Sequence, residues 1–156
     1  MVVSGPGLRL EELAQNLFDV VTQFCLAVPR GRRRTGDLKE IEFLTLSILR
    51  SHAPLIVGDI QRMLGVLPAQ MSRIIRSLEA RERPLIACRI NPQDKRKIDV
   101  ALTAAGVTAF REHQAVRVRV IAGMLGRLSG EDLDDLERVV VKLNESLTAP
   151  AAVTAS

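Results

Sequence analysis

The chain has no tryptophan and no tyrosine, and its four phenylalanines bring the aromatic content to only 3%. A core with so few rings must be mostly aliphatic, which suits helices packed on helices better than a β-sandwich. Two cysteines exclude a disulfide framework and fit a reducing compartment. No apolar run reaches the roughly 18 residues that a membrane span needs, and residues 1–10 do not resemble a secretion signal. We therefore expect a cytoplasmic protein that does not cross a membrane.

Motifs that mark catalysis are also missing. The sequence contains no glycine-rich phosphate loop, no His-Glu-x-x-His and no Gly-x-Ser-x-Gly. Its two histidines, His52 and His113, stand apart from each other and from both cysteines, without the spacing of metal ligands. We therefore expect neither an enzyme nor a metal site, and no cofactor.

Positive charge is concentrated in the middle of the chain. Residues 55–102 carry nine Lys or Arg against five Asp or Glu, whereas residues 130–147 carry two against six. A basic region attracts polyanions such as nucleic acid. A further basic cluster at residues 30–34 fits two interpretations equally well: it contacts phosphates beside a binding site, or it is a solvated loop.

Apolar spacing predicts long helices at both ends of the chain. Residues at intervals of three and four form one stripe along about 10–28 and further stripes along the last two predicted helices. Another helix is expected to start at Asp37, with Glu40 completing a capping box. Thr103 and Ser129 suit the caps of the last two helices, the first of which is expected to include Leu128.

Between these long helices the pattern predicts a helix-turn-helix followed by a β-hairpin. Two short helices, about 57–64 and 68–81, flank a turn that contains Gly65. From residue 85 the period changes to two, which predicts a hairpin over 85–102 with a charged tip. The fold class is therefore mainly α with a small β wing.

The helix predicted over 68–81 has two different faces. Met71, Ile74, Ile75 and Leu78 fall on the side expected to face the core. On the outer side, arginine can bind guanine, glutamine can bind adenine, and serine can bind bases or phosphate. The predicted DNA-contacting residues of this helix are Pro68, Ala69, Gln70, Ser72, Arg73 and Arg76, with Ser77 also on the outer side. Any soluble helix can also show arginine to water, so this helix alone does not decide the function.

The hairpin tip makes nucleic acid a stronger hypothesis. Lys95, Arg96 and Lys97 stand beside a single acid, Asp94. A loop of this kind can reach the narrow minor groove, whose negative potential attracts arginine. The alternative is an ordinary solvated turn.

The hairpin also resembles the wing of a known family, that of the multiple-antibiotic-resistance regulator (MarR). The family's wing has Asp-x-Arg, then a short strand, then Leu-Thr-x-x-Gly at the start of a helix. Those places are filled here by Asp94, Arg96, Leu102, Thr103 and Gly106. Upstream the similarity continues through Leu64-Gly65, Ser72-Arg73 and Leu78-Glu79, and the predicted helix order agrees along nearly the whole chain.

The resemblance implies a winged-helix homodimer that binds a roughly palindromic DNA duplex and regulates transcription, most often as a repressor. It also implies that Arg96 enters the minor groove while Asp94 holds its guanidinium. Three positions depart from the family pattern. Leu67 replaces the usual Ser or Thr cap, Arg83-Pro84 replaces a pair that ends in glycine, and Cys88 replaces a frequent basic residue.

These features give a domain hypothesis. Residues 37–102 form the DNA-binding part, 8–36 and 103–147 form a helical dimerisation region, and 148–156 form a flexible tail. The apolar stripes of the terminal helices exceed what the DNA-binding part needs, so we expect a two-fold dimer to bury them. The predicted dimerisation residues are Leu13, Leu17, Val20, Ile121, Leu125, Leu136, Val140 and Leu143. The alternative is that these helices fold back on their own subunit.

Other functions stay open at this point. The family resemblance suggests a small-molecule effector pocket, for which Phe18, Thr22, Phe43 and Arg111 are candidates. A redox-sensing regulator is an alternative, although the apolar stripe around Cys25 favours a buried, inert thiol, and Cys88 alternates in phase with Ile86 and Ile90 like a small core residue. A winged-helix module that binds protein instead of DNA would be expected to expose apolar or aromatic anchors.

Overall fold

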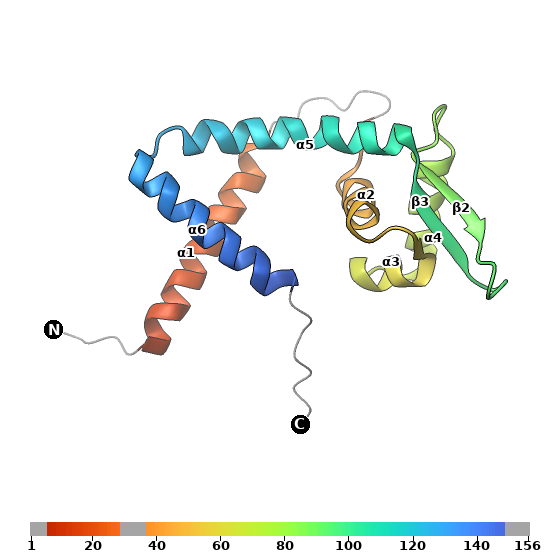
Figure 1. The fold of residues 1–156 in the computed structure, drawn as a ribbon, viewed down its shortest axis with the longest axis horizontal. Helices are drawn as coiled ribbons and strands as arrows, with labels where there is room; N and C mark the ends of the chain where they lie inside the picture. The colour runs from red at the N-terminus through yellow and green to blue at the C-terminus, as the bar shows by residue number, and fades with distance from the viewer. Residues whose placement is uncertain (1–5, 29–36, 149–156) are drawn as a thin grey trace. The chain divides into compact units, whose positions relative to one another are not determined.

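The computed structural model describes residues 6–28 and 37–148, which contain six helices and one three-stranded sheet (Figure 1). The elements in chain order are α1 (Pro6–Ala27), α2 (Glu40–His52), β1 (Leu55–Ile56), α3 (Val57–Leu64), α4 (Pro68–Glu79), β2 (Ile86–Ile90), β3 (Ile98–Leu102), α5 (Ala104–Leu125) and α6 (Gly130–Thr148). The basic cluster at 30–34 and nearly all of the predicted tail lie outside the described residues. The fold is therefore mainly helical with a small sheet, as predicted.

The chain divides into two compact units. The first, here called the lobe, is residues 28–117 and contains α2, the three strands, α3, α4 and the first part of α5. The second, here called the terminal-helix unit, consists of α1, the end of α5 from Val118 onward, and α6. Among the described residues, the buried hydrophobic side chains all belong to the lobe.

The core of the lobe is aliphatic. Side chains from α2, α3, α4 and β3 are completely buried in it: Leu46, Leu49, Ile60, Leu78 and Val100. Phe110 of α5 closes one side and is nearly as well buried. The buried side of α4 is the one that its spacing predicted. In α2, however, Leu44 lies at helical spacing from Ile41 and Ile48 and is 42% exposed, while Leu46 is buried instead. The packing of these buried side chains positions α4 against the sheet.

The sheet has the order β1-β3-β2, with both pairs antiparallel. Val100 in the central strand pairs with Cys88 on one side and Leu55 on the other. Sequence reasoning missed β1, because two residues followed directly by a helix are too few to show a period. The expected core position of Ile90 is wrong: its side chain is 69% exposed, because it pairs with Ile98 at the outer end of the hairpin.

The helix starts agree with the predicted caps in two of three cases. The Thr103 hydroxyl accepts the Gly106 amide at 3.0 Å at the start of α5, and the Ser129 hydroxyl accepts the Asp132 amide at 3.1 Å at the start of α6. The predicted Asp37–Glu40 box is wrong. Helix α2 begins at Glu40, and the cap is the Lys39 amide, which donates to Glu42 Oε2 at 2.8 Å. At its other end, α5 stops at Leu125, short of the expected Leu128.

Gly106 is required by the approach of α5 to the strand β2. A Cβ atom at this position would lie 2.0 Å from the carbonyl oxygen of Leu85. That same oxygen accepts the amide of Thr103 at 3.1 Å. The glycine of the Leu-Thr-x-x-Gly pattern therefore allows the first turn of α5 to pack directly on the backbone at the base of the hairpin.

The terminal-helix unit has no buried side chain among residues 7–27 and 118–148. Leu13 is 62% exposed, and most of the other predicted dimerisation residues are exposed, with Leu125 and Leu136 half-buried. The expectation of a buried Cys25 is not met, since this residue is exposed in the single chain. None of the helices in the described ranges has the length and apolarity needed to cross a membrane.

Candidate nucleic-acid interface

Helix α4 presents the two faces that its sequence predicts. Met71, Ile74 and Leu78 are buried, and Ile75 is half-buried. The outer residues are all exposed: Pro68, Ala69, Gln70, Ser72, Arg73 and Arg76. The structure therefore leaves every predicted DNA-contacting residue of this helix accessible. Ser77 is the correction, because it is half-buried and donates a hydrogen bond inward to Glu42 Oε1.

Glu42 anchors the far end of α4 to the start of α2. Glu42 is 2% exposed, and its carboxylate accepts hydrogen bonds from Ser77 of α4, from the Lys39 amide and from Arg81 just beyond α4. The Arg81 guanidinium lies 3.0 Å from Glu42 Oε2 and also donates to the Asp37 carbonyl at 3.4 Å. A buried carboxylate is stable only when it is paired in this way. These contacts therefore hold the C-terminal end of α4 against the start of α2.

The ionisation of Glu42 follows from these contacts. Burial by itself raises the pKa of the carboxyl, but the Ser77 hydroxyl, the Lys39 amide and the positive charges of Arg81 and Lys39 outweigh it and lower the pKa below its usual value. The carboxylate is therefore charged at neutral pH. Sequence reasoning did not find this group, because Glu40, two residues earlier, competes as the capping acid and only the fold brings Arg81 near.

The outer side of α4 and the wing strands share a hollow. An open depression of about 260 Å³ is lined by Ser72 and Arg76 of α4 together with Ile98 of β3. Its remaining lining comes from Val57, Ile75, Glu79 and Cys88. Two of the predicted DNA-contacting residues thus border the same surface depression as the wing.

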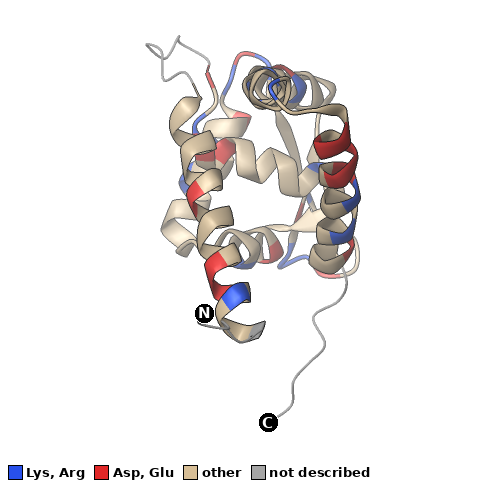
Figure 2. Cartoon of the chain, turned by 90° about the vertical axis from the view of Figure 1, so that its left-hand side faces the viewer, with Lys and Arg blue, Asp and Glu red and all other residues tan. Residues whose placement is uncertain are grey.

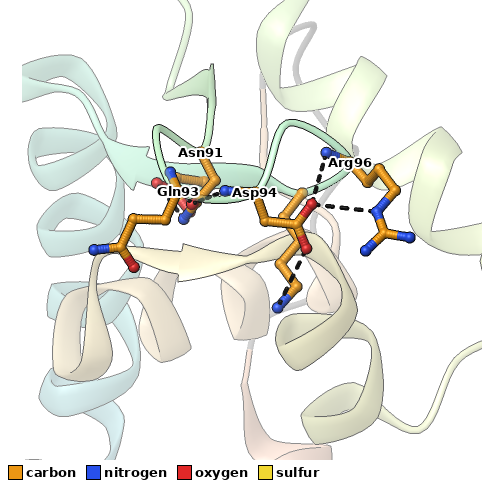
Figure 3. Close-up of polar contacts among 6 residues, drawn as sticks. Asn91, Gln93, Asp94 and Arg96 are labelled. Carbon is orange, nitrogen blue, oxygen red and sulfur yellow. Dashed lines mark hydrogen bonds and ion pairs between the residues drawn. The ribbon is translucent and has the colours of Figure 1, made fainter.

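The wing tip is held by side chains of the turn itself (Figure 3). Asn91 donates to Asp99 Oδ1 at 2.9 Å, and its own oxygen accepts the amides of Gln93 and Asp94 at 2.9 and 3.0 Å. Asp94 Oδ1 accepts the Arg96 amide at 3.1 Å and the Arg96 Nε at 3.3 Å. The Arg96 side chain is nevertheless 92% exposed. Asp94 therefore orients an arginine that points out from the protein, as the family resemblance implied.

Lysine side chains complete the basic tip. Lys97 Nζ lies 3.8 Å from Asp94 Oδ2, and Lys95 and Lys97 are both exposed. Helix α6, in contrast to the wing tip, begins with mostly acidic turns. It is the helix that leads to the end marked C in Figure 2. A polyanion would therefore be attracted to the wing and repelled from the start of α6.

Cys88 lies on β2 beside the hollow and is half-buried. Burial, followed by the hydrogen bond and the negative charge of Glu79, raises the pKa of its thiol to about 12. Because the thiolate is the reactive form, this environment argues against Cys88 as a redox sensor.

The two predicted effector residues of the lobe have different surroundings. Phe43 stacks on Phe110 with ring centroids 5.1 Å apart, and the centroid of the His113 ring lies 4.5 Å from that of Phe43. The Arg117 guanidinium lies over the Phe43 ring, 4.9 Å from its centroid. Arg111 is exposed on α5. Phe18 and Thr22 lie on α1, in the other unit, where the Thr22 hydroxyl donates to the Phe18 carbonyl at 2.9 Å. No described residues form a group of three or more His, Cys, Asp or Glu that could hold a metal ion.

Comparisons with known proteins found a matching family and similar proteins. A family model described as MarR family matches residues 38–98, which lie within the lobe. The HTH-type transcriptional repressor MdtR of Bacillus subtilis (strain 168) is 30% identical over 105 residues, which make up 67% of this chain and 66% of that protein. The chain spans less than two thirds of the length of the curated relatives that it matches.

Solved structures show the same fold. The protein RV1404 from Mycobacterium tuberculosis has a TM-score of 0.69 and 22% identity, and the match covers 97% of this chain and 99% of that one. BpsR of Bordetella bronchiseptica, whose DNA binding is described as regulated by 6-hydroxynicotinic acid, has a TM-score of 0.59, 20% identity and coverages of 85% and 98%. The family model that matches the lobe and the 30% identity to MdtR show that the chain belongs to the MarR family.

Proposed function

We propose that this protein is a sequence-specific, double-stranded DNA-binding transcriptional regulator that works as a repressor and has no catalytic activity. The observation that supports this most strongly is the position of the exposed residues Ser72 and Arg76, which border the same hollow as the wing. A helix is the right width for the major groove, and an arginine-tipped wing suits the adjoining minor groove.

The proposal assigns separate roles to the helix and the wing. Arg73 and Arg76 contact bases or phosphates in the major groove, and Gln70 favours adenine. Arg96 enters the minor groove, oriented by Asp94, while Lys95 and Lys97 contact phosphates. In domain terms, residues 37–102 bind DNA, whereas residues 8–36 and 103–147 dimerise.

Dimerisation is the second part of the proposal. It is supported by the apolar side chains that the terminal-helix unit leaves exposed, such as Leu13, Leu17 and Val140. Exposed apolar patches of this extent are uncommon on monomeric proteins. A two-fold dimer presents two copies of α4 and of the wing, which makes a roughly palindromic operator the expected target.

A small-molecule effector is the third part. It is supported by the similarity to BpsR, whose DNA binding is described as regulated by 6-hydroxynicotinic acid. Phe18, Thr22, Phe43 and Arg111 remain the proposed pocket residues. This part is tested without DNA by measuring, with calorimetry, the binding of 6-hydroxynicotinic acid and similar small acids to the wild type and to Arg111→Ala. The variant should bind more weakly.

The test of DNA binding is its salt dependence. Duplex affinity should fall steeply with salt as counterions are released. Arg96→Ala should weaken binding to all duplexes and reduce the slope of log K against log salt by about 1. Arg73→Ala should also weaken binding and, in addition, blur the preference between sequences.

A matched control comes from the terminal-helix unit. Arg138 is an exposed arginine on α6 that pairs with Asp135 and is not among the proposed DNA-contacting residues. Arg138→Ala therefore removes the same charge and should leave the salt slope unchanged. Equal losses from Arg73→Ala and Arg96→Ala on every duplex would contradict the assigned roles. A protein that binds no duplex at low salt would instead be a protein-binding winged helix.

A further inference from the structure

Leu67 forms the N-cap of α4 and is 74% exposed. Its backbone is extended, with φ −74° and ψ 154°, and its side chain makes no capping hydrogen bond. A serine or threonine here would satisfy one of the free amides at the start of the helix. Leucine provides no such bond, and burial within the lobe does not compensate for it. The residue therefore weakens the helix start without an evident structural gain.

The segment of the chain that contains Leu67 carries no charge. Residues 64–72 contain neither acid nor base, although Arg62 and Arg73 stand on either side of this stretch. Pro68 has no amide hydrogen to donate, and the next exposed side chains are those of Ala69 and Gln70. Phosphate contacts depend on cations and on hydrogen-bond donors. The amides and polar side chains at the start of α4 can make such contacts, but the Leu67 side chain, which has no donor, cannot.

Base edges offer a better match to this apolar side chain. The first residues of a recognition helix contact base edges in the major groove, where the thymine C5 methyl is the apolar group. We propose that Leu67 is a specificity-determining residue whose side chain packs on a thymine methyl in each half-site, with Gln70 favouring adenine close by. This inference rests on the proposed function, because it requires α4 to lie in the major groove.

The test compares thymine with deoxyuridine, which lacks only the C5 methyl. A duplex is first selected from a random pool with the wild-type protein, and each thymine is then replaced in turn. At one position in each half-site, deoxyuridine should weaken wild-type binding about fourfold, the effect of one buried methyl group. In Leu67→Ala, the same replacement should have no effect, while other positions keep their wild-type sensitivity.

Two further variants separate base contact from helix stability. Leu67→Ser adds a capping oxygen, so it should unfold at a higher temperature than Leu67→Ala and yet remain insensitive to the thymine methyl. Met63→Ala removes another exposed apolar side chain, at the end of α3, and should retain the fourfold effect. A purely structural role for Leu67 would make thymine sensitivity follow stability in these variants.

The possible outcomes distinguish failure of the thymine contact from failure of the proposed DNA-binding function. If wild-type protein selects a duplex but tolerates deoxyuridine everywhere, the thymine contact is refuted and DNA binding stands. The same holds if Leu67→Ala keeps the wild-type sensitivity. If no duplex is selected at low salt, the proposed function fails and the thymine contact fails with it.

Discussion

In the lobe, the side chains of Leu46, Leu49 and Ile60 are completely buried within a single chain, whereas residues 7–27 and 118–148 of the terminal-helix unit include none that is buried. Both regions are built from helices with apolar residues at intervals of three and four. The difference lies in what faces each stripe. In the lobe, α2, α3, α4 and the sheet cover one another, while in the other unit much of the apolar surface stays open.

This comparison separates two kinds of information in an apolar stripe. The stripe indicates which side of a helix is expected to be covered. It does not state whether the cover comes from the same chain or from a second copy. A symmetric dimer is the common solution for such a surface, and the proposed operator symmetry would follow from it.

The largest expected effect is that of removing a core leucine from the lobe. Leu46→Ala should lower the free energy of unfolding by about 2–5 kcal/mol, because the cavity cannot be refilled in a packed core. Urea unfolding should show this loss equally at low and high protein concentration. Leu143→Ala is the matched truncation on α6, and its loss should grow with protein concentration as dimer forms. Concentration-independent losses for both would contradict the difference between the units.

A smaller effect is expected from the Glu42 carboxylate. Glu42→Ala removes the carboxylate to which the partly buried Arg81 and Ser77 donate and should cost about 1–3 kcal/mol. Glu40→Ala, on the same helix, removes an exposed partner of Arg117 and should cost under about 1 kcal/mol. Urea unfolding of both variants at neutral pH measures the difference, and equal losses would show that the Glu42 contacts do not anchor α4.

The pH dependence of Glu42 has a definite sign. Because the folded pKa is lowered, the stabilisation is present above the ordinary carboxyl value of about 4.3 and is lost as the pH falls through the folded pKa. Glu42→Gln should remove this part of the acid dependence. An unchanged acid profile in that variant would assign the effect to another carboxylate.

The terminal-helix unit has its own test, on assembly. Leu143→Glu places a charge in the exposed apolar stripe of α6 and should weaken dimerisation tenfold or more, roughly 1.4 kcal/mol. Sedimentation equilibrium measures the dissociation constant, and circular dichroism of the monomer checks that the lobe stays folded. Arg138→Ala on the same helix provides a control that leaves the stripe intact. A wild type that stays monomeric at high concentration would overturn the proposed dimer.

Features that depend on local spacing could be predicted from the sequence, whereas features that depend on contacts between distant residues could not. Helix order, the wing and the buried side of α4 followed from spacing, since Met71, Ile74 and Leu78 form a local pattern. The two-residue β1 and the Glu42–Arg81 pair could not be predicted, because they depend on residues far apart in the chain. Cys25 is exposed in the single chain, so its predicted burial depends on the proposed dimer. The predicted DNA, dimer and effector residues remain predictions.

The smallest expected effect is the pH dependence of stability that His113 causes. Because His113 lies in the lobe, this effect tests whether the lobe unfolds independently of the terminal-helix unit. Burial, with a further contribution from Arg117, lowers the pKa of the imidazole, while Glu40 and Asp37 partly oppose this. Its buried Nε2 also has no hydrogen-bond partner among the described residues, so a proton there would be poorly solvated. The unfolded chain therefore takes up the proton first. As a result, stability should fall as the pH drops from above the ordinary value of about 6.5 through the folded pKa.

His113→Phe, which preserves a ring beside Phe43, should flatten this part of the pH profile, whereas substitution of the exposed His52 by Gln should retain it. Chemical unfolding at several pH values and at two protein concentrations measures both variants. Because His113 belongs to the lobe, the slope should be the same at each concentration. A slope that appears only when dimers form would instead link the titration to the terminal helices, and would show that the two units are not energetically separate.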